Sequence, residues 1–356
     1  MHGRREGMRP VRILNYGSLN LDYVYSVDHI VRPGETISSS CMNTFCGGKG
    51  LNQSIALARA GSRVCHAGMV GPEVCHAGMV GPEVCHAGMV GPDGGILLDV
   101  LKENGVDTEH VREVEERTGS AIIQVSADGQ NSIVLFGGAN QKNEEGLIDE
   151  ALSGFAAGDW LLLQNEVNLL DRLVERGAAT GMRIALNPSP YDEKVEGVDL
   201  SFVSLLLINE VEGEQMAGLK EPREIMAFLR GKYPDMGVVL TLGADGALYS
   251  GGSGVGGEGA LYSDGAGVAG GGGAGIIGHP AFDVTVVDTT AAGDAFTGYF
   301  ITALCEGQQP HDALRLASLA SALAVSRAGA ATSIPWREEV DGARLSVVRN
   351  YEDKGY

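Results

Sequence analysis

The segment Asp288–Asp294, with the sequence DTTAAGD, has the residue types and spacing that a phosphoryl-transfer site needs. Its small residues lead directly into a predicted helix start, where the first N–H groups have no acceptor within the helix. Together with the helix dipole, such groups can bind a phosphate or a developing oxyanion. A carboxylate at Asp294 would repel phosphate here unless it accepted a proton from a substrate hydroxyl. On this segment alone, capping of the helix by Asp294 is an equal alternative.

A second glycine-rich segment, Gly47–Gln53, precedes a helical pattern that covers Ser54–Ala60. Its glycines allow a ligand to approach the backbone closely, and the amide of Asn52 can both donate to and accept from hydroxyl groups. A phosphate-binding P-loop is excluded, because Leu51 follows Gly50 where that motif requires Lys and then Ser or Thr. No G-x-G-x-x-G follows a predicted strand, so the sequence does not indicate a dinucleotide site either.

Further short motifs accompany these two segments in a consistent order along the chain. With them, the chain resembles the ribokinase-like (PfkB) carbohydrate kinases over roughly residues 11–340. Each motif alone is weak evidence, whereas their common order is strong and favours catalysis over capping for Asp294. The further motifs are Gly17–Asp22, Gly34–Thr36, Gly137–Asn140, Gln164–Glu166, Leu186–Pro190, Asn209–Glu212, Thr241–Gly246 and Ser333–Glu339.

Short apolar segments alternate with helical patterns along most of the chain, which predicts a parallel sheet covered by helices on both faces. Ligands of such a sheet bind beyond the carboxyl ends of its strands, where Asn187, Asn209 and Gly243 stand. The predicted strands are Val11–Tyr16, Trp160–Leu163, Arg183–Leu186, Leu205–Ile208 and Val238–Thr241. The predicted helices are Ile96–Asn104, Leu169–Thr180, Glu221–Gly231 and His311–Ser326.

The resemblance implies a ribokinase-like α/β fold, in which a mostly parallel central sheet with helices on both faces carries a small β lid over the sugar site. The core would then comprise residues 11–19, 48–117 and 139–345. The lid would comprise 20–47 and 118–138, where the sequence alternates in the manner of strands. Residues 1–10 and 346–356 are predicted to be tails.

The composition of the chain limits the kinds of molecule that it can bind. The chain has 356 residues, enough for a large core, and its formal net charge of -20 argues against nucleic acid or an anionic membrane surface. No apolar run approaches the roughly 18 residues of a membrane span, and the N-terminus lacks the apolar region of a secretory signal. Three of the six cysteines are copies within a repeat, so their even number does not indicate disulfides. We therefore expect a reduced, cytoplasmic protein.

Two stretches depart from the family pattern, and the first is a tandem repeat of ten residues at 64–93. The unit Val64–Glu73 recurs twice, although the family requires only one strand here. Any copy can fill that place, so the pairing register is poorly specified, and we expect one copy in the core with the others looped out or paired at the surface. A metal site formed by the repeated cysteines with His66, His76 and His86 is the alternative, although C-x-x-C spacing is absent.

The second stretch, 250–278, is rich in glycine and includes the run Gly270–Gly273. Such a composition predicts a flexible loop. The fragment Gly246–Ser250 recurs as Gly259–Ser263, so we interpret the stretch as a duplication that the surface tolerates rather than as a functional lid.

The resemblance implies transfer of the γ-phosphoryl group of ATP to a sugar hydroxyl, with the 5-hydroxyl of D-ribose as the expected acceptor. Asp294 would be the base, and the N–H groups of Ala292, Gly293 and Asp294 would form the anion hole. Taken alone, Asn20 and Asp22 could equally form a strand-end turn, and Glu166 a solvated carboxylate. The implied sugar ligands are Asn20, Asp22, Gly48, Lys49, Gly50, Asn52, Glu166 and Asp294, and the implied nucleotide ligands are Asn187, Thr241, Gly243, Gly246 and Gly293.

Two cation sites also follow from the resemblance. Asn209 and Glu212 match an N-x-x-E pattern that organises Mg²⁺ in this family through water, and helix capping by the same pair is a compatible alternative. Potassium is the second implied cation, and without it the expected contact of Asp288 is an ion pair with Arg327. The implied potassium ligands are the side chains of Asp288 and Ser333 and the carbonyl groups of Thr290, Ala324, Arg327 and Gly329.

Two positions that we place near the sugar site differ from the common pattern. Leu51 stands where the family commonly has alanine, and Asn165 where an apolar residue is common. A kinase for fructose, a deoxy-sugar or an adenosine-like nucleoside is therefore the alternative function. From other classes, a catalytically idle sugar-binding protein and a metal-binding module built on the repeat are possible. The resemblance implies a homodimer formed through the β lid.

Overall fold

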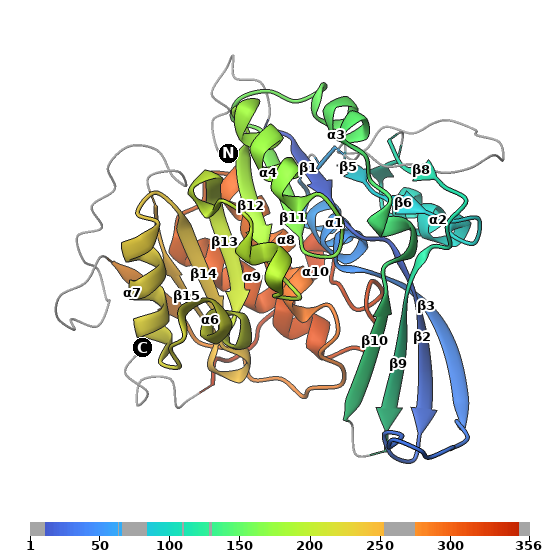
Figure 1. The fold of residues 1–356 in the computed structure, drawn as a ribbon. Coiled ribbons are helices and arrows are strands. Elements are labelled where there is room, and N and C mark those ends of the chain that lie inside the picture. Colours follow the sequence, from blue (N-terminus) through green and yellow to red (C-terminus); the bar gives the residue numbers. More distant parts are fainter. Residues whose placement is uncertain are drawn as a thin grey trace.

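The computed structural model of the protein describes residues 11–62, 64–65, 84–108, 110–127, 130–252 and 275–348. The first predicted tail, most of the second, repeat residues 66–83 and glycine-rich residues 253–274 lie outside the described residues. In the described part, a large sheet covered by helices carries a smaller sheet that projects from one end of the molecule (Figure 1).

The central sheet has ten strands in the described chain. They are β1 (Ile13–Tyr16), β4 (Val64–Cys65), β5 (Val84–Ala87), β7 (Val106–Asp107), β11 (Trp160–Gln164), β12 (Arg183–Asn187), β13 (Val203–Asn209), β14 (Gly237–Thr241), β15 (Ala247–Ser250) and β16 (Ile276–His279). Their order is β16-β15-β14-β13-β12-β11-β1-β5-β7, and β4 also pairs with β1. The pairs are parallel except at one edge, where β15 runs antiparallel to β14 and β16.

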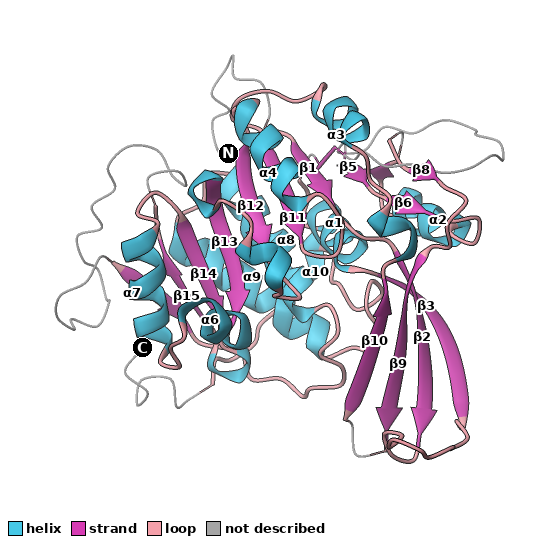
Figure 2. Cartoon of the chain, viewed as in Figure 1, coloured by secondary structure: helices cyan, strands magenta, loops and turns pink. Residues whose placement is uncertain are grey.

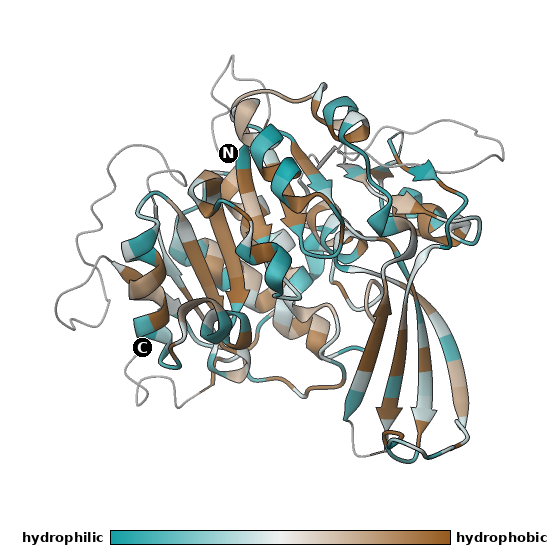
Figure 3. Cartoon of the chain, viewed as in Figure 1, coloured by the Kyte–Doolittle hydropathy of each residue, from teal (hydrophilic) through white to brown (hydrophobic). Residues whose placement is uncertain are grey.

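Helices cover both faces of this sheet because its strands direct alternate side chains into two separate cores (Figure 2). The central strands are accordingly among the most hydrophobic segments of the molecule (Figure 3). The helices of the first core are α1 (Lys49–Arg59), α2 (Gly95–Glu103), α8 (Ala292–Cys305), α9 (Pro310–Val325) and α10 (Arg337–Gly342). Those of the second are α3 (Glu145–Leu152), α4 (Leu170–Ala179), α5 (Glu193–Glu196), α6 (Glu210–Ala217) and α7 (Pro222–Lys232).

The smaller sheet is the lid, and its strand order is β10-β9-β2-β3. Strand β2 pairs antiparallel with β3 and parallel with β9, and β9 pairs antiparallel with β10. These strands are β2 (Asn20–Val27), β3 (Cys41–Gly47), β9 (Gly119–Ser126) and β10 (Asn131–Phe136). A short parallel pair, β6 (Met89–Val90) with β8 (Arg112–Glu113), and three 3₁₀ turns complete the described elements: Gly138–Gln141, Leu200–Phe202 and Gly243–Asp245. The predicted α/β class with a β lid is confirmed. The predicted strands and helices occur with ends shifted by at most two residues, except that the helix predicted at Ser54–Ala60 begins five residues earlier, at Lys49.

Two copies of the tandem repeat reach the central sheet. The third copy supplies β5, which pairs with β1 from Leu14 to Tyr16, whereas the first copy supplies β4. Cys65 and Cys85, which occupy the same position in their copies, both lie opposite Leu14. The first and third copies therefore adopt the same register against β1.

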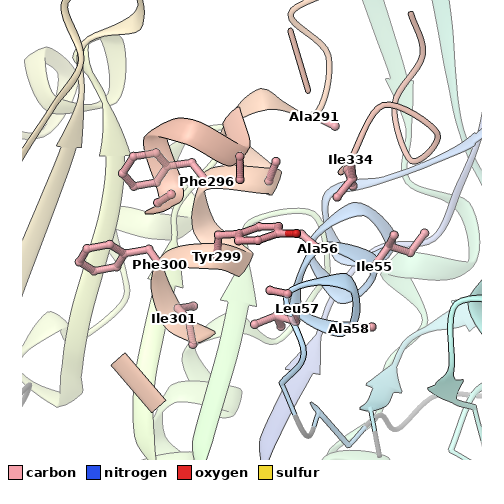
Figure 4. Close-up of a cluster of buried hydrophobic side chains, with 14 of the residues drawn as sticks. Ile55, Ala56, Leu57, Ala58, Ala291, Phe296, Tyr299, Phe300, Ile301 and Ile334 are labelled. Carbon is pink, nitrogen blue, oxygen red and sulfur yellow. The ribbon is translucent and has the colours of Figure 1, made fainter. Parts of the chain in front are cut away.

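Helices α1 and α8 pack closely in the first core, and this contact positions the site (Figure 4). A Cβ on Gly298 would lie 2.5 Å from the Cβ of Ala56, so the two helices can approach this closely only because residue 298 is glycine. One turn earlier on the same faces stand Asn52 and Asp294. In the described part of the chain, no helix combines the length and the apolar character that crossing a bilayer requires.

Candidate active site

A cavity of about 380 Å³ opens where the lid meets the carboxyl ends of the central strands. This volume lies within the range of small-molecule sites, and its position is the one expected for a ligand of a parallel sheet. The lid contributes apolar side chains that include Ile123, Ile133 and Leu135. The predicted site residues in its lining are Asn20, Asp22, Gly48, Lys49, Asn52, Glu166, Asn187, Asn209, Glu212, Thr241, Thr290, Gly293 and Asp294.

The start of α8 forms one wall of the cavity. Ala291, in the left-handed conformation with φ 60°, turns the chain into the helix, so that Ala292, Gly293 and Asp294 are its first three residues. The N–H of Ala292 donates to Thr289 O at 3.3 Å, whereas those of Gly293 and Asp294 have no acceptor among the described residues. A Cβ on Gly293 would meet no atom within 4 Å, so no contact within the protein requires glycine there. This open, donor-rich end suits an anionic ligand.

Asp294 projects from this wall, and both its oxygens are held by amides of α1. Its Oδ2 accepts from Asn52 Nδ2 at 3.0 Å, and its Oδ1 accepts from Gln53 Nε2 at 2.9 Å. The side chain is buried and does not cap α8, whose N-cap is Ala291, so the capping interpretation is wrong. The two amides thereby fix the orientation of the Asp294 carboxylate in the wall of the cavity.

The lid end of the cavity gathers the predicted sugar ligands. Glu166 Oε2 accepts from the backbone N–H of Lys49 at 3.1 Å and from the hydroxyl of Ser18, so it is not a solvated surface carboxylate. Asn20 and Asp22 lie within β2 rather than in a turn. Asn20 Oδ1 accepts from Asn140 Nδ2 at 2.8 Å, which fixes the orientation of its amide.

Two charged groups of the cavity have shifted pKa values. Burial, and in second place the negative charge of Glu166, raises the pKa of Asp22 to about 7. Its Oδ1 is buried and has no hydrogen-bond partner among the described residues, so it can accept from a ligand. Burial lowers the pKa of Lys49, but the carboxylates of Asp294, Glu166 and Glu212 outweigh burial and raise that pKa above its ordinary value.

At the opposite end, residues at the carboxyl ends of β12, β13 and β14 reach the cavity. Asn209 caps α6 in a reciprocal arrangement: Glu212 N–H donates to Asn209 Oδ1 at 2.9 Å, and Asn209 N–H donates to Glu212 Oε2 at 3.0 Å. The capping interpretation is therefore correct, and because Glu212 is buried and lines the cavity it remains compatible with a metal role. Gly243 and Gly246 do not line the cavity. A Cβ on Gly246, which has φ 103°, would lie 2.1 Å from His279 O, so close backbone packing explains this glycine.

Asp288 joins two loops, one before α8 and one after α9, that contain most of the expected potassium ligands. Its Oδ1 accepts from the N–H of Thr290 at 2.9 Å, and its Oδ2 accepts from the N–H of Gly329 at 2.9 Å. Burial raises the pKa of Asp288, but a hydrogen bond from the Thr290 hydroxyl at 2.6 Å and these two backbone hydrogen bonds outweigh burial and lower that pKa below its usual range. Arg327 instead pairs with Glu339 at 2.7 Å, so the predicted ion pair between Asp288 and Arg327 is wrong.

Of the other two predicted potassium ligands, Ala324 lies in the last turn of α9 and Ser333 lies in the loop that follows that helix. Ala324 O accepts from the N–H of Arg327 at 3.1 Å. Ser333 is fully buried, and its hydroxyl donates to Ala330 O at 2.8 Å. That bond leaves the acceptor side of the Ser333 hydroxyl available.

Three residues placed at the sugar site by sequence do not line the cavity. Leu51 is fully buried in the first core, and Asn165 donates to Pro190 O at 2.6 Å and to Asp192 Oδ1 at 2.8 Å. The expectation that these two residues lie beside the sugar is therefore wrong. Gly50 instead packs against the backbone that follows β1: a Cβ on Gly50 would lie 2.5 Å from Ser18 N.

The described residues contain no cluster of His, Cys, Asp or Glu with the geometry of a metal site. Of the three repeat histidines, His66 and His76 lie outside the described chain. His86 is fully buried, with its Nδ1 at 3.0 Å from Ser54 Oγ, and burial lowers its pKa well below the usual value. His86 is therefore a neutral core residue.

Sequence reasoning gave no role to the buried amides behind the cavity. Gln53 and Gln164 occur in the motifs that carried the resemblance, but nothing in their spacing indicated that they touch. The structure places Gln164 Nε2 at 2.7 Å from Gln53 Oε1, and thereby connects two motifs to Asp294. Asn140, another buried amide, donates to Asn20 and so orients a predicted sugar ligand.

Comparison with known proteins places this geometry in a family. The model of the pfkB family carbohydrate kinases matches residues 12–337. The chain belongs to this family. A ribokinase from Haemophilus influenzae is 32% identical to it over 330 residues, which cover 91% of this chain and 95% of the relative.

Solved structures agree with this assignment. The crystal structure of a ribokinase from Thermotoga maritima matches with a TM-score of 0.72 and 30% identity, covering 93% of this chain and 98% of that one. A ribokinase from Arabidopsis thaliana, complexed with ribose and ATP, matches with a TM-score of 0.67 and 26% identity, covering 94% and 98%. The predicted family, fold class and assignment as a carbohydrate kinase are confirmed.

Proposed function

We propose that this carbohydrate kinase transfers the γ-phosphoryl group of ATP to the 5-hydroxyl of D-ribose. The observation that carries the proposal is the carboxylate of Asp294, oriented by two amides at the donor-rich start of α8 and open to the cavity. The ribokinase from Arabidopsis, complexed with ribose and ATP, supports the choice of substrates.

In this reaction Asp294 accepts the proton of the sugar hydroxyl as the hydroxyl oxygen attacks the γ-phosphorus. The bond between the γ-phosphorus and its bridging oxygen breaks, and ADP leaves with the electron pair. The N–H groups of Gly293 and Asp294 stabilise the charge on the transferred group, and Lys49 adds a positive charge on the same side of the cavity. Positioning and electrostatics therefore supply most of the catalysis.

The sugar would be bound at the lid end. The unpartnered Oδ1 of Asp22 and the carboxylate of Glu166 accept hydrogen bonds from ring hydroxyls, while the amide of Asn52 can donate or accept. The apolar lid residues Ile123, Ile133 and Leu135 would cover the ring and exclude water. Asn187 and Thr241, at the other end of the cavity, would contact the nucleotide.

Two cations complete the proposal. Glu212 and Asn209 would hold Mg²⁺ through water, since a buried carboxylate at the cavity wall suits a metal that keeps most of its waters. The ion would neutralise charge on the phosphates of ATP. Potassium would be held behind α8 by Asp288, Ser333 and nearby carbonyl groups, in a loop that the Asp288 hydrogen bonds already order.

The proposal extends to assembly and location. A second copy of the chain would pack on the lid, whose exposed side chains include Ile122, Val134 and Phe136. The free thiols of Cys41, Cys46 and Cys305 support a reducing compartment such as the cytoplasm.

The test is an ATP-dependent phosphorylation assay on D-ribose, 2-deoxyribose, fructose and adenosine, with Mg²⁺ and K⁺ present. We expect ribose to give the highest kcat/KM, and Asp294→Asn to lower kcat by about 10²–10⁴-fold, the usual contribution of a general base. Preference for another acceptor would retain the mechanism and change the substrate. Ribose binding without turnover in the wild type would indicate an idle sugar-binding protein, and full activity of Asp294→Asn would refute the base.

A further inference from the structure

Gln53 touches the base from outside the cavity. It follows Asn52 on α1 and is fully buried, and it does not belong to the cavity lining. Its Nε2 donates both to Asp294 Oδ1 at 2.9 Å and to Asn187 Oδ1 at 3.0 Å. One amide thus links the start of α8 to the end of β12, and both hydrogens of the amide are used.

The orientation of the Gln53 amide is determined by its acceptors. Asn187 must present Oδ1 to Gln53, because Asn187 Nδ2 donates to the backbone carbonyl of Leu207 at 3.0 Å. As the proposed base, the carboxylate of Asp294 acts as an acceptor. A flipped Gln53 amide would therefore place its oxygen against two acceptors, so its nitrogen must point toward Asp294.

A second amide fixes the other side of Gln53. Gln164 Nε2 donates to Gln53 Oε1 at 2.7 Å and to Asn15 Oδ1 at 2.8 Å. Asn15 is oriented in turn, because its Nδ2 donates to the backbone carbonyl of Gly50 at 2.8 Å. Backbone carbonyl groups thus fix the amides of Asn187 and Asn15, which stand at the two ends of the chain of hydrogen bonds. The amides of Gln53 and Gln164 lie between these two, so neither can flip without placing two acceptors or two donors against each other.

We propose that Gln53 is a positioning residue that holds the Asp294 carboxylate in its reactive orientation, and that Gln164 acts on the base only through Gln53. This inference rests on the proposed role of Asp294 as the base. Burial strengthens it: Gln53, Gln164 and Asn15 are each completely buried, so no water competes for their hydrogen bonds. A side chain held in this way loses little orientation when the substrate binds, which is the condition for efficient transfer of the proton.

The test uses Gln53→Met, Gln164→Met and the double variant in the full-length protein, assayed with ribose and ATP. We expect Gln53→Met to lower kcat by about 10–100-fold, because misplacement of a catalytic group by about 1 Å has an effect of this size. KM for ribose should stay within about threefold, since Gln53 does not line the cavity. Gln164→Met should lower kcat by about 3–10-fold, and the double variant should fall no further than Gln53→Met, as expected for residues that act in series.

The matched control is Asn165→Leu. It removes a buried amide adjacent to Gln164 that contacts Pro190 and Asp192 instead of the base, and kcat should stay within about twofold of wild type. A Gln53→Met protein with wild-type kcat, alongside an inactive Asp294→Asn, would overturn the positioning role alone. Additive losses in the double variant would overturn the serial arrangement. An active Asp294→Asn would refute the proposed function itself, which separates the two failures.

Discussion

At the scale of residues, the cavity combines several carboxylates with one nearby cation. Asp22, Glu166, Glu212 and Asp294 all line it, and Lys49 is stabilised in its charged form by three of them. A protein with a formal net charge of -20 can bind a polyphosphate here only through local donors. The N–H groups at the start of α8, Lys49 and a divalent cation at Glu212 would supply them. The remaining carboxylates are then free to recognise sugar hydroxyls.

The pKa of Asp22 leads to a prediction about stability. Its shift from 3.8 to about 7 means that, between about pH 4 and 7, the folded protein keeps a proton that the unfolded chain releases. The free energy of unfolding therefore falls as the pH rises through this window. We expect Asp22→Asn to raise the free energy of unfolding of the ligand-free protein by about 2–4 kcal/mol at pH 8, and by about 1 kcal/mol at pH 5.

Urea denaturation at the two pH values measures this difference. Glu166→Gln serves as the companion variant, because it removes the negative charge that is the second cause of the raised Asp22 pKa. The pKa of Asp22 should then be lower, so the decrease of the free energy of unfolding with pH should end at a lower pH than in the wild type. An equal effect of Asp22→Asn at pH 5 and pH 8 would show that Asp22 is not protonated in this window.

Glu212 allows its structural and its metal role to be separated. Glu212→Gln keeps an oxygen that can accept from the Asn209 N–H, so the cap of α6 should persist. The charge is lost, however, and we expect the Mg²⁺ concentration for half-maximal activity to rise about tenfold, a change of about 1.4 kcal/mol. Magnesium titrations of activity, together with thermal melts, test both parts. An unchanged Mg²⁺ requirement would argue against the metal role, and a large drop in Tm would show that the cap depends on the charge.

At the scale of elements, the tandem repeat is the main departure from the family pattern. Because Cys65 and Cys85 occupy the same register against Leu14, deletion of residues 64–83 joins Arg63 to Val84 and restores one strand in that register. We expect the shortened protein to keep kcat and KM within about twofold. Its Tm should be equal or higher, since a shorter insertion lowers the entropy of loop closure. A loss of folding on deletion would show that the extra copies are structurally required.

The companion substitution His86→Ala tests whether the copies can replace one another. Each copy carries histidine at the equivalent position, so in the full chain another copy can supply it against Ser54. The destabilisation by His86→Ala should therefore be smaller in the full-length protein than in the shortened one. Equal losses in both backgrounds would indicate that only the third copy can place its histidine against Ser54.

Much of this architecture was accessible from sequence because it depends on local patterns. The strands β11 to β14 are continuous apolar runs, and the polar motifs that follow them mark the edge of the sheet where the cavity lies. The contact of Gln164 with Gln53 spans 111 residues, and that of Gln53 with Asp294 spans 241, so no local pattern encodes either. Leu51 shows the converse error, because proximity to Asn52 in the sequence did not mean proximity to the sugar: adjacent helix positions face different directions.

At the scale of the whole molecule, one face of the lid is turned toward the cavity and the other face is turned toward solvent. Alternation along its strands directs Ile123, Ile133 and Leu135 toward the cavity. The intervening side chains of Ile122 and Val134, which are cross-strand neighbours, point away from it and are 48% and 64% exposed. The small sheet projects from the core, and its strand β10 is largely hydrophobic (Figure 3). Exposed apolar side chains on one face of such a sheet are typical of an interaction surface. A second copy of the chain is the partner that we propose for this outer face.

This arrangement predicts that a single charge on the outer face prevents assembly. We expect the wild type to sediment as a dimer and Val134→Lys to sediment as a monomer, because a buried, unpaired ammonium group strongly opposes association. Phe228→Lys, on the exposed side of α7, is the matched control and should leave the dimer intact. The monomeric variant should also show a higher KM for ribose, since the lid would lose the contact that holds it over the sugar. A wild-type protein that sediments as a monomer at assay concentrations would rule out the lid as a dimer interface.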